Sequence, residues 1–193
     1  MKKLTAADLY TLEAYSRERT AFRERVLAHK APRRVAVGAH VTLIFEDRLT
    51  IQYQIQEMLR VERVFEAAGI QDELDAYNPL IPDGSNLKAT MLIEFSDPEE
   101  RAEQLGHLRG IEHLITLEIE GCVPVGAIAD DDMERSNDSK TSAVHFVRFE
   151  FTAEQVAAFR RAETVALAID HAAYAQRTVL DTVARTALAA DFD

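Results

Sequence analysis

The sequence has few of the residues that mark disulfide-bonded, secreted or membrane-spanning proteins. It contains one cysteine, no tryptophan, five prolines and seven glycines in 193 residues. A single thiol cannot form an internal disulfide, and it fits a reducing cytoplasm. No apolar run approaches the roughly 20 residues that cross a bilayer, and no apolar stretch follows Lys2 and Lys3 as it would in a signal peptide. We therefore expect a cytoplasmic protein with no membrane partner.

Several catalytic signatures are also absent. The glycines form neither GxGxxG nor GxxxxGK[ST], so the common phosphate-binding loops are missing. The chain has no G-x-S-x-G elbow of the α/β-hydrolases. It has no HExxH and no Glu-x-x-His pair, which zinc proteases and di-iron bundles use. The acidic stretch 130–138 lacks the glycine and glutamate spacing of a calcium loop, so we expect it to be solvated. These absences predict no particular cofactor and favour a protein without catalytic activity.

The charge is strongly negative overall and unevenly distributed. The net charge is −11, and residues 1–34 carry nine Lys/Arg against four Asp/Glu, which is +5 and leaves −16 for the rest. An acidic body argues against nucleic acid as the main partner, because phosphates require a basic surface. The basic N-terminal segment is either a solvated helix or a surface that docks an anionic partner through Arg17, Arg19 and Arg23.

Hydrophobic spacing predicts helices early in the chain and strands later. Helices are expected over residues 5–31, 48–68 and 71–77, with Thr5 as the first cap and Gly69 as a stop. Residues 35–45 alternate as one half-buried strand. Further strands are expected at 87–95, 114–120, 123–129, 142–151, 165–170 and 176–180, and further helices from Pro98, Thr152 and Asp181. This order predicts one domain, 1–193, of the α+β class: a mainly antiparallel sheet with N-terminal helices packed on it.

The predicted helix 48–68 carries polar groups close to its apolar stripe. Gln54 and Glu62 lie at or beside the stripe that Ile51, Ile55, Met58 and Phe65 form. A buried polar group without a partner costs roughly 1–3 kcal/mol. These side chains therefore either connect parts of the fold or line a site.

Two histidines fall on apolar strand faces and form the first candidate site. His145 shares a face with Val147 and Phe149, and His171 shares one with Leu167 and Ile169. If the strands are neighbours, the two imidazoles could meet near Glu62, Asp170 and Tyr174, and could bind a metal or transfer a proton. The alternative is a pair of structural histidines that hydrogen-bond to the backbone.

A second candidate site consists of cations that could hold a small anion. Arg48, Arg60 and Lys88 are the candidate ligands. Glu57, Arg60 and Tyr77 are expected at the rim of the histidine site. The alternative for Arg60 is an ordinary ion pair with Glu57 on the helix surface.

Several segments together resemble a known bacterial family. They are QIQEMLRVER at 54–63, QDELDAYNPLIPDGSNLKATMLIEF at 71–95, NDSKTSAVHFVRFEF at 137–151 and IDHAAY at 169–174. These segments are similar to the family catalogued as domain of unknown function 3501, and the likeness covers essentially the whole chain. The resemblance implies no established activity. Family genes often lie beside those for rubrerythrin and an iron–sulfur oxidoreductase, which implies a role in peroxide or redox defence by association.

Our leading hypothesis is a non-catalytic accessory or binding protein of such a redox system. It would contact a rubrerythrin or iron–sulfur partner through its basic N-terminal helix or its polar-striped helix, and it would form a homodimer. The alternative is an enzyme that uses metal or binds a small anion at the His145/His171/carboxylate cluster.

Overall fold

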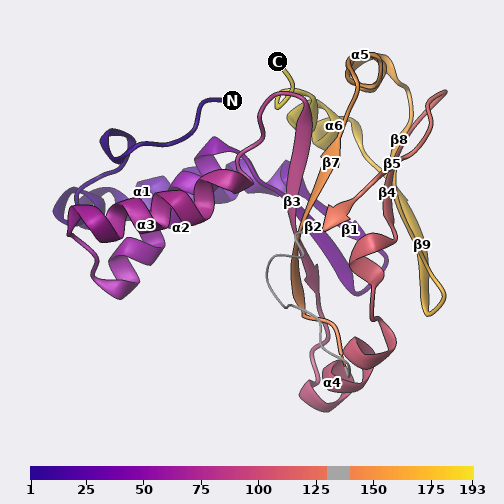
Figure 1. Ribbon diagram of the computed structural model, residues 1–193, viewed down its shortest axis with the longest axis horizontal. Helices are drawn as coiled ribbons and strands as arrows, with labels where there is room; N and C mark the ends of the chain where they lie inside the picture. Colours follow the sequence, from indigo (N-terminus) through magenta and orange to yellow (C-terminus); the bar gives the residue numbers. More distant parts are fainter. Residues whose placement is uncertain (130–139) are drawn as a thin grey trace.

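The computed structural model describes residues 1–129 and 140–193 of the chain. Within these residues, three N-terminal helices lie together at one side, and two antiparallel sheets with three further α-helices form the rest (Figure 1). We call the three-helix part the helical arm and the remainder the body. The α+β class predicted from the sequence is confirmed. The acidic stretch 130–138 lies outside the described residues.

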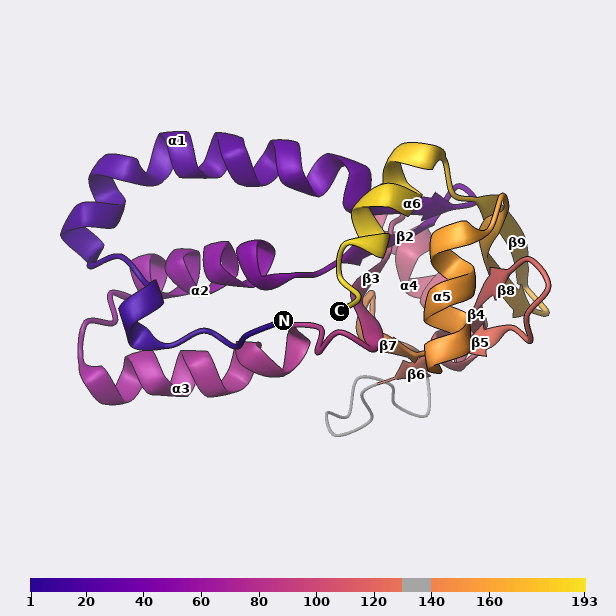
Figure 2. The ribbon, with the colours of Figure 1, turned by 90° about the horizontal axis from the view of Figure 1, so that it is seen from above.

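The helical arm consists of α1 (Leu12–Lys30), α2 (Arg48–Glu62) and α3 (Ala67–Tyr77). Thr11 caps α1 by accepting a hydrogen bond from the Ala14 N–H, and Asp47 caps α2 through the N–H groups of its first turn. The N-terminal segment, with the 3₁₀ turn η1 (Ala6–Asp8), runs beside α3 (Figure 2). Two small apolar clusters fill the arm, one centred on Tyr15, Phe22 and Val26 and the other on Ile51, Ile55, Leu59 and Leu74.

Two predicted helix boundaries in the arm are wrong. The helix expected from Thr5 begins at Leu12, because Thr5 and Asp8 cap only the turn η1. The helix expected to stop at Gly69 ends at Glu62, where Arg63 takes the left-handed conformation with φ 56°. Gly69 instead lies inside α3. A Cβ there would approach Val64 Cγ1 to 2.6 Å, so this glycine permits close packing of the loop and does not end a helix.

The first sheet has the order β1-β2-β3-β7-β6, and all its neighbours are antiparallel. Its strands are β1 (Arg34–Val37), β2 (Val41–Phe45), β3 (Asn86–Ile93), β6 (Ile128–Ala129) and β7 (Val144–Glu150). The predicted single strand 35–45 is therefore a hairpin, with Val37 paired to Val41. Its loop has three residues, 38–40, so Val37 and Val41 both face the core as the alternation predicts, whereas Ala39 between them is exposed in the turn.

The second sheet has the order β5-β4-β8-β9 and is also antiparallel. Its strands are β4 (Ile115–Ile119), β5 (Val125–Gly126), β8 (Val165–His171) and the edge strand β9 (Tyr174–Val179). The predicted strand 123–129 is divided between the two sheets, because β5 pairs with β4 and β6 pairs with β7. The remaining elements are η2 (Ala31–Arg33), η3 (Asn78–Leu80), α4 (Pro98–His107), η4 (Ile111–His113), α5 (Ala153–Arg161) and α6 (Thr182–Ala189).

The main core lies between the two sheets and contains alternate residues of both. Met91 and Phe149 of the first sheet and Leu117 and Leu167 of the second are fully buried in it. The intervening residues of β3 and β7 face away from this core. Lys88 and Arg148 are among them, on the outer face of the first sheet. None of the helices in the described residues is both long and apolar enough to cross a membrane.

Candidate functional site

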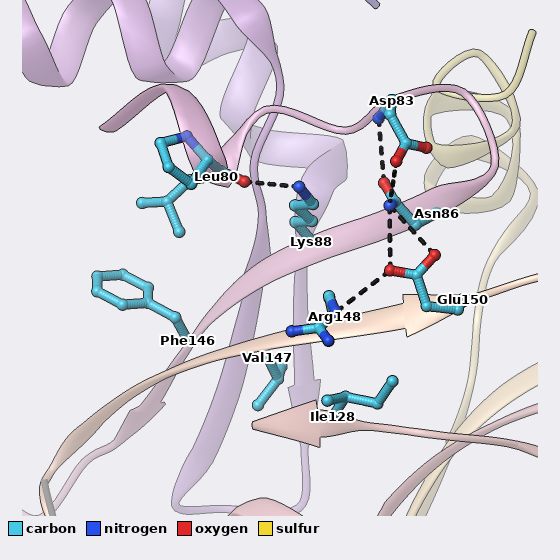
Figure 3. A pocket seen from close by; sticks show the side chains of 10 residues that line it. Leu80, Asp83, Asn86, Lys88, Ile128, Phe146, Val147, Arg148 and Glu150 are labelled. Carbon is cyan, nitrogen blue, oxygen red and sulfur yellow. Dashed lines mark hydrogen bonds and ion pairs between the residues drawn. The ribbon is translucent and has the colours of Figure 1, made fainter. Parts of the chain in front are cut away.

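An open pocket lies on the outer face of the first sheet, where η3 approaches β3, β7 and β6. Its volume is about 340 Å³, which is within the range of small-molecule sites. Figure 3 shows its lining side chains. Among the described residues these are Pro79, Leu80, Asp83, Asn86, Lys88, Ile128, Phe146, Val147, Arg148 and Glu150. The pocket therefore combines charged, amide and apolar side chains from segments far apart in sequence.

Two cations of the pocket, Lys88 and Arg148, lie directly opposite each other on β3 and β7. Like charges in that cross-strand position are destabilising. Lys88 Nζ donates to the Pro79 carbonyl at 2.6 Å, and Arg148 Nε pairs with Glu150 Oε1 at 3.2 Å. In the described part of the chain these are the only polar contacts of the two cationic groups. Both therefore retain N–H donors for a ligand.

The electrostatics of Lys88 favour an added negative charge. Burial lowers the pKa of the Lys88 ammonium, and the nearby Arg148 lowers it further, while Asp83 and Glu150 act in the opposite direction. An anion bound between Lys88 and Arg148 would offset both the loss of solvation and the mutual repulsion.

A polar framework holds one side of the pocket in place. Asn86 is 2% exposed. Its Nδ2 donates to Asp83 Oδ2 at 2.9 Å and to both Glu150 oxygens at 3.2 and 3.3 Å, and its Oδ1 accepts from the Asp83 N–H. Burial raises the pKa of Asp83, but hydrogen bonds from Ser85 and Asn86 outweigh it, and the net shift is downward. Both carboxylates therefore have a fixed position beside the cations.

The other side of the pocket is apolar. Leu80 and Phe146 are half-buried, and Ile128 is 42% exposed although it is a large aliphatic side chain. In Figure 3 Leu80 and Phe146 lie on the side away from Asp83 and Asn86, with Lys88 between the two sides, and Ile128 lies apart from them next to Arg148. The pocket thus has an acidic end, a cationic centre and an apolar end.

His145, the first candidate for a catalytic or metal-binding residue, faces the core between the sheets, as its strand pattern predicts. It is 3% exposed. Its Nε2 lies 2.9 Å from Thr141 Oγ1, 3.0 Å from the Ser142 carbonyl and 3.9 Å from Glu112 Oε2. Glu112, which sequence analysis did not select, is its carboxylate neighbour in place of Glu62.

The other members of the predicted histidine cluster lie elsewhere. His171 ends β8 in the second sheet, where Nε2 contacts the Arg109 carbonyl at 3.2 Å and Nδ1 accepts from the Ala173 N–H. Asp170 is exposed. Tyr174 donates to the Val37 carbonyl and accepts from the His40 N–H, which ties β9 to the turn between β1 and β2.

The predicted convergence of these residues with Glu62 is wrong. Glu62 is exposed at the end of α2 that points away from the sheets (Figure 2). Phe65, expected on the buried stripe, follows the end of the helix and is 72% exposed. Within residues 1–129 and 140–193, no three His, Cys, Asp or Glu side chains are grouped as a metal site would require.

The residues predicted as an anion site with Lys88 are engaged elsewhere in the arm. Arg48 pairs with Asp8 at 2.6 Å, and Arg60 pairs with Glu57 at 3.1 Å. Tyr77 packs against the apolar cluster around Ile55 and Leu74. Of the predicted set, only Lys88 lines the pocket.

The three predicted docking arginines differ in their surroundings. Arg19 donates to both oxygens of Glu57 at 2.8 Å and so joins α1 to α2. Arg17 pairs with Glu13 at 3.3 Å on the exposed side of α1, and Arg23 is exposed. Arg19 therefore has an internal role, and a docking surface on α1 would depend on Arg17 and Arg23.

Four pocket residues were not predicted from the sequence: Asp83, Asn86, Arg148 and Glu150. A signal for Arg148 and Glu150 was present, because both alternate with apolar residues in the predicted strand 142–151. Their meeting with Lys88 depends on the pairing of β3 with β7, which joins segments about 60 residues apart.

The structure thus defines an α+β protein of two antiparallel sheets with a helical arm and a polar pocket on the outer sheet face. The chain belongs to the family described as protein of unknown function (DUF3501), whose model matches residues 3–192. It is similar to a solved novel protein of unknown function from Burkholderia pseudomallei K96243, with 46% identity, a TM-score of 0.94 and coverage of 100% of both chains. No curated protein matches the chain.

Proposed function

We propose that this protein binds a small organic anion in the pocket on the outer face of the first sheet. The observation that carries the proposal is the position of Lys88 and Arg148, directly opposite each other at the floor of the pocket. A cross-strand pair of opposite charges would stabilise the two adjacent strands, whereas a pair of cations destabilises them. A bound carboxylate would accept hydrogen bonds from both cations, and charge-assisted bonds of this kind contribute about 1.5–3 kcal/mol each.

A thermal-shift series at pH 7 tests the proposal. The ligands are 3-methylbutanoate and 3-phenylpropanoate, and the neutral 3-phenylpropanamide is the matched control. We expect the carboxylates to raise the melting temperature in a saturable way and the amide to have no effect. At 100 times its dissociation constant a ligand adds about 2.7 kcal/mol of stability.

Variants of the two cations identify the site. Lys88→Gln and Arg148→Gln should each remove the response to the carboxylates. Arg34→Gln is the control, because Arg34 is a strand arginine with one exposed partner, Glu94, outside the pocket. Equal responses in wild type, Lys88→Gln and Arg148→Gln would contradict the proposal.

A second proposal concerns a protein partner. The resemblance of the chain to its family implied an accessory role beside rubrerythrin and iron–sulfur proteins. An exposed apolar tip of the helical arm supports a protein contact of this kind. Val61 is 62% and Phe65 is 72% exposed, and large exposed apolar groups often mark interaction sites.

The double variant Val61→Ser/Phe65→Ser tests this proposal. It should weaken binding to a purified rubrerythrin of the same host without changing the stability of the protein. Unchanged binding, or no binding by wild type, would contradict it.

A further inference from the structure

We infer that the ligand of the pocket is a zwitterionic α-amino acid with an apolar side chain, an inference that rests on the proposed anion site. The chemical groups follow a definite order across the pocket. Asp83 and Glu150 lie at one end, Lys88 and Arg148 lie in the centre, and Leu80 and Phe146 lie at the other end, with Ile128 next to Arg148 (Figure 3).

The charge balance of the pocket favours a ligand with both signs. Two cations and two carboxylates give the lining side chains a formal sum of zero. A multiply charged anion such as phosphate would gain from Lys88 and Arg148 but would be repelled by Asp83 and Glu150. A zwitterion places its carboxylate against the cations and its ammonium against the acidic end, so that each charge meets an opposite one.

The acidic end is prepared to accept an ammonium group. Asn86 donates from Nδ2 to Asp83 and to Glu150, which holds the two carboxylates on either side of one buried amide. Each ionised carboxylate has about four lone-pair sites. Glu150 receives Asn86 and Arg148, and Asp83 receives Asn86 and the backbone and hydroxyl of Ser85. Because Asn86 reaches both Glu150 oxygens, each of the two carboxylates accepts three such contacts and keeps a similar capacity. Glu150 also pairs with Arg148 in the centre of the pocket and is the expected main contact of the ligand ammonium.

The apolar end determines the class of side chain. Leu80 and Phe146 are half-buried at this end, and Ile128, which is 42% exposed, adds apolar surface beside Arg148. Burying a leucine or phenylalanine side chain against such a surface contributes about 1.5–3 kcal/mol. A charged or strongly polar side chain would lose solvation there without gaining a partner. Leucine and phenylalanine are therefore the expected ligands, and aspartate and lysine are not.

Isothermal titration calorimetry with three matched compounds tests this inference on the full chain. The compounds are L-phenylalanine, 3-phenylpropanoate, which lacks the amine, and 2-phenylethylamine, which lacks the carboxylate. We expect phenylalanine to bind at least tenfold more tightly than either. If 3-phenylpropanoate binds as tightly as phenylalanine, the zwitterion inference is overturned while the anion site stands. If neither phenylalanine nor 3-phenylpropanoate binds, the zwitterion inference and the proposed anion site both fail.

A Glu150→Gln variant separates the two parts of the site. It should reduce the affinity for phenylalanine about tenfold and leave that for 3-phenylpropanoate unchanged or stronger, because Arg148 then loses its internal partner. Arg34→Gln should change neither affinity. Equal losses for both compounds in Glu150→Gln would mean that Glu150 only positions Arg148, and would overturn its assignment as the ammonium contact.

Discussion

Arg33 donates from Nη2 to the carboxylate of Asp191, although the two residues are 158 positions apart in the chain. Both side chains are 2% exposed. Arg33 also lies 3.5 Å from Asp47, the cap of α2, which in turn contacts His29 at the end of α1. Burial raises the pKa of Asp191 to about 6, although Arg33 opposes the shift. This buried network connects the helical arm to the C-terminal end of the body.

We predict that Arg33→Met destabilises the protein by about 3–5 kcal/mol, because it leaves two buried carboxylates without their cation. Urea unfolding measures the loss. The adjacent Arg34→Met is the matched control: Arg34 and Glu94 are about half exposed, and exposed pairs contribute about 0–1 kcal/mol. Similar losses in the two variants would contradict a connecting role for the network.

Glu57 should make the stability of the arm depend on pH. Its carboxylate accepts hydrogen bonds from Arg19, Tyr15 and Arg60. The Arg19 hydrogen bond is the main cause that lowers the pKa of Glu57 to about 2. Between about pH 4.5 and 2 the Glu57 carboxyl is protonated in the unfolded chain and ionised in the folded chain. The stabilisation is therefore complete above about pH 4.5 and is lost as the pH falls toward 2.

We predict that Glu57→Gln is less stable than wild type by about 1–3 kcal/mol at pH 7. This difference in unfolding free energy should shrink as the pH is lowered from 5 to 3. Urea unfolding at pH 5 and at pH 3 measures it. Glu13→Gln, which removes the partner of Arg17 in a highly exposed pair, should change stability little at either pH. A constant difference for Glu57→Gln would show that the pKa of Glu57 is not shifted by folding.

The turn between β1 and β2 should not tolerate a side chain at Gly38. Gly38 has φ +74°, and a Cβ there would lie 2.5 Å from the Tyr174 hydroxyl. Gly121 has a similar φ of +78° but nothing within 4 Å of the same position. We predict that Gly121→Ala costs about 1–2 kcal/mol, the penalty of the left-handed conformation, and that Gly38→Ala costs more. Thermal unfolding of the two variants tests the difference, and equal losses would contradict the contact with Tyr174.

Local signals predicted much of the fold. Asp97 and Pro98 begin α4 and Thr152 caps α5 as expected, and the alternation in 142–151 corresponds to β7. The end of α2 could not be predicted in this way, because Arg63 adopts a left-handed conformation that its residue type does not favour. The next residue, Val64, then packs against the apolar cluster of the arm and close to Gly69 of α3.

The candidate site was less predictable than the fold, for a related reason. Lys88 could be selected as a cation, but the alternation of β7 shows only that Arg148 faces outward. Which strand lies beside it depends on long-range pairing in the first sheet. The histidine cluster failed similarly: His145 and His171 each lie at the expected strand positions, yet they belong to different sheets.

The most direct test of the account is nuclear magnetic resonance of isotopically labelled protein during titration with 3-phenylpropanoate. Binding at the proposed site predicts saturable shifts of the Ile128 methyl signals and the Arg148 Nε–H signal, with the Arg177 Nε–H signal unchanged. Arg177 is a suitable internal reference because it pairs with Glu118 on the second sheet, outside this pocket. Shifts confined to other residues, or no saturable shift, would contradict an anion site at Lys88 and Arg148.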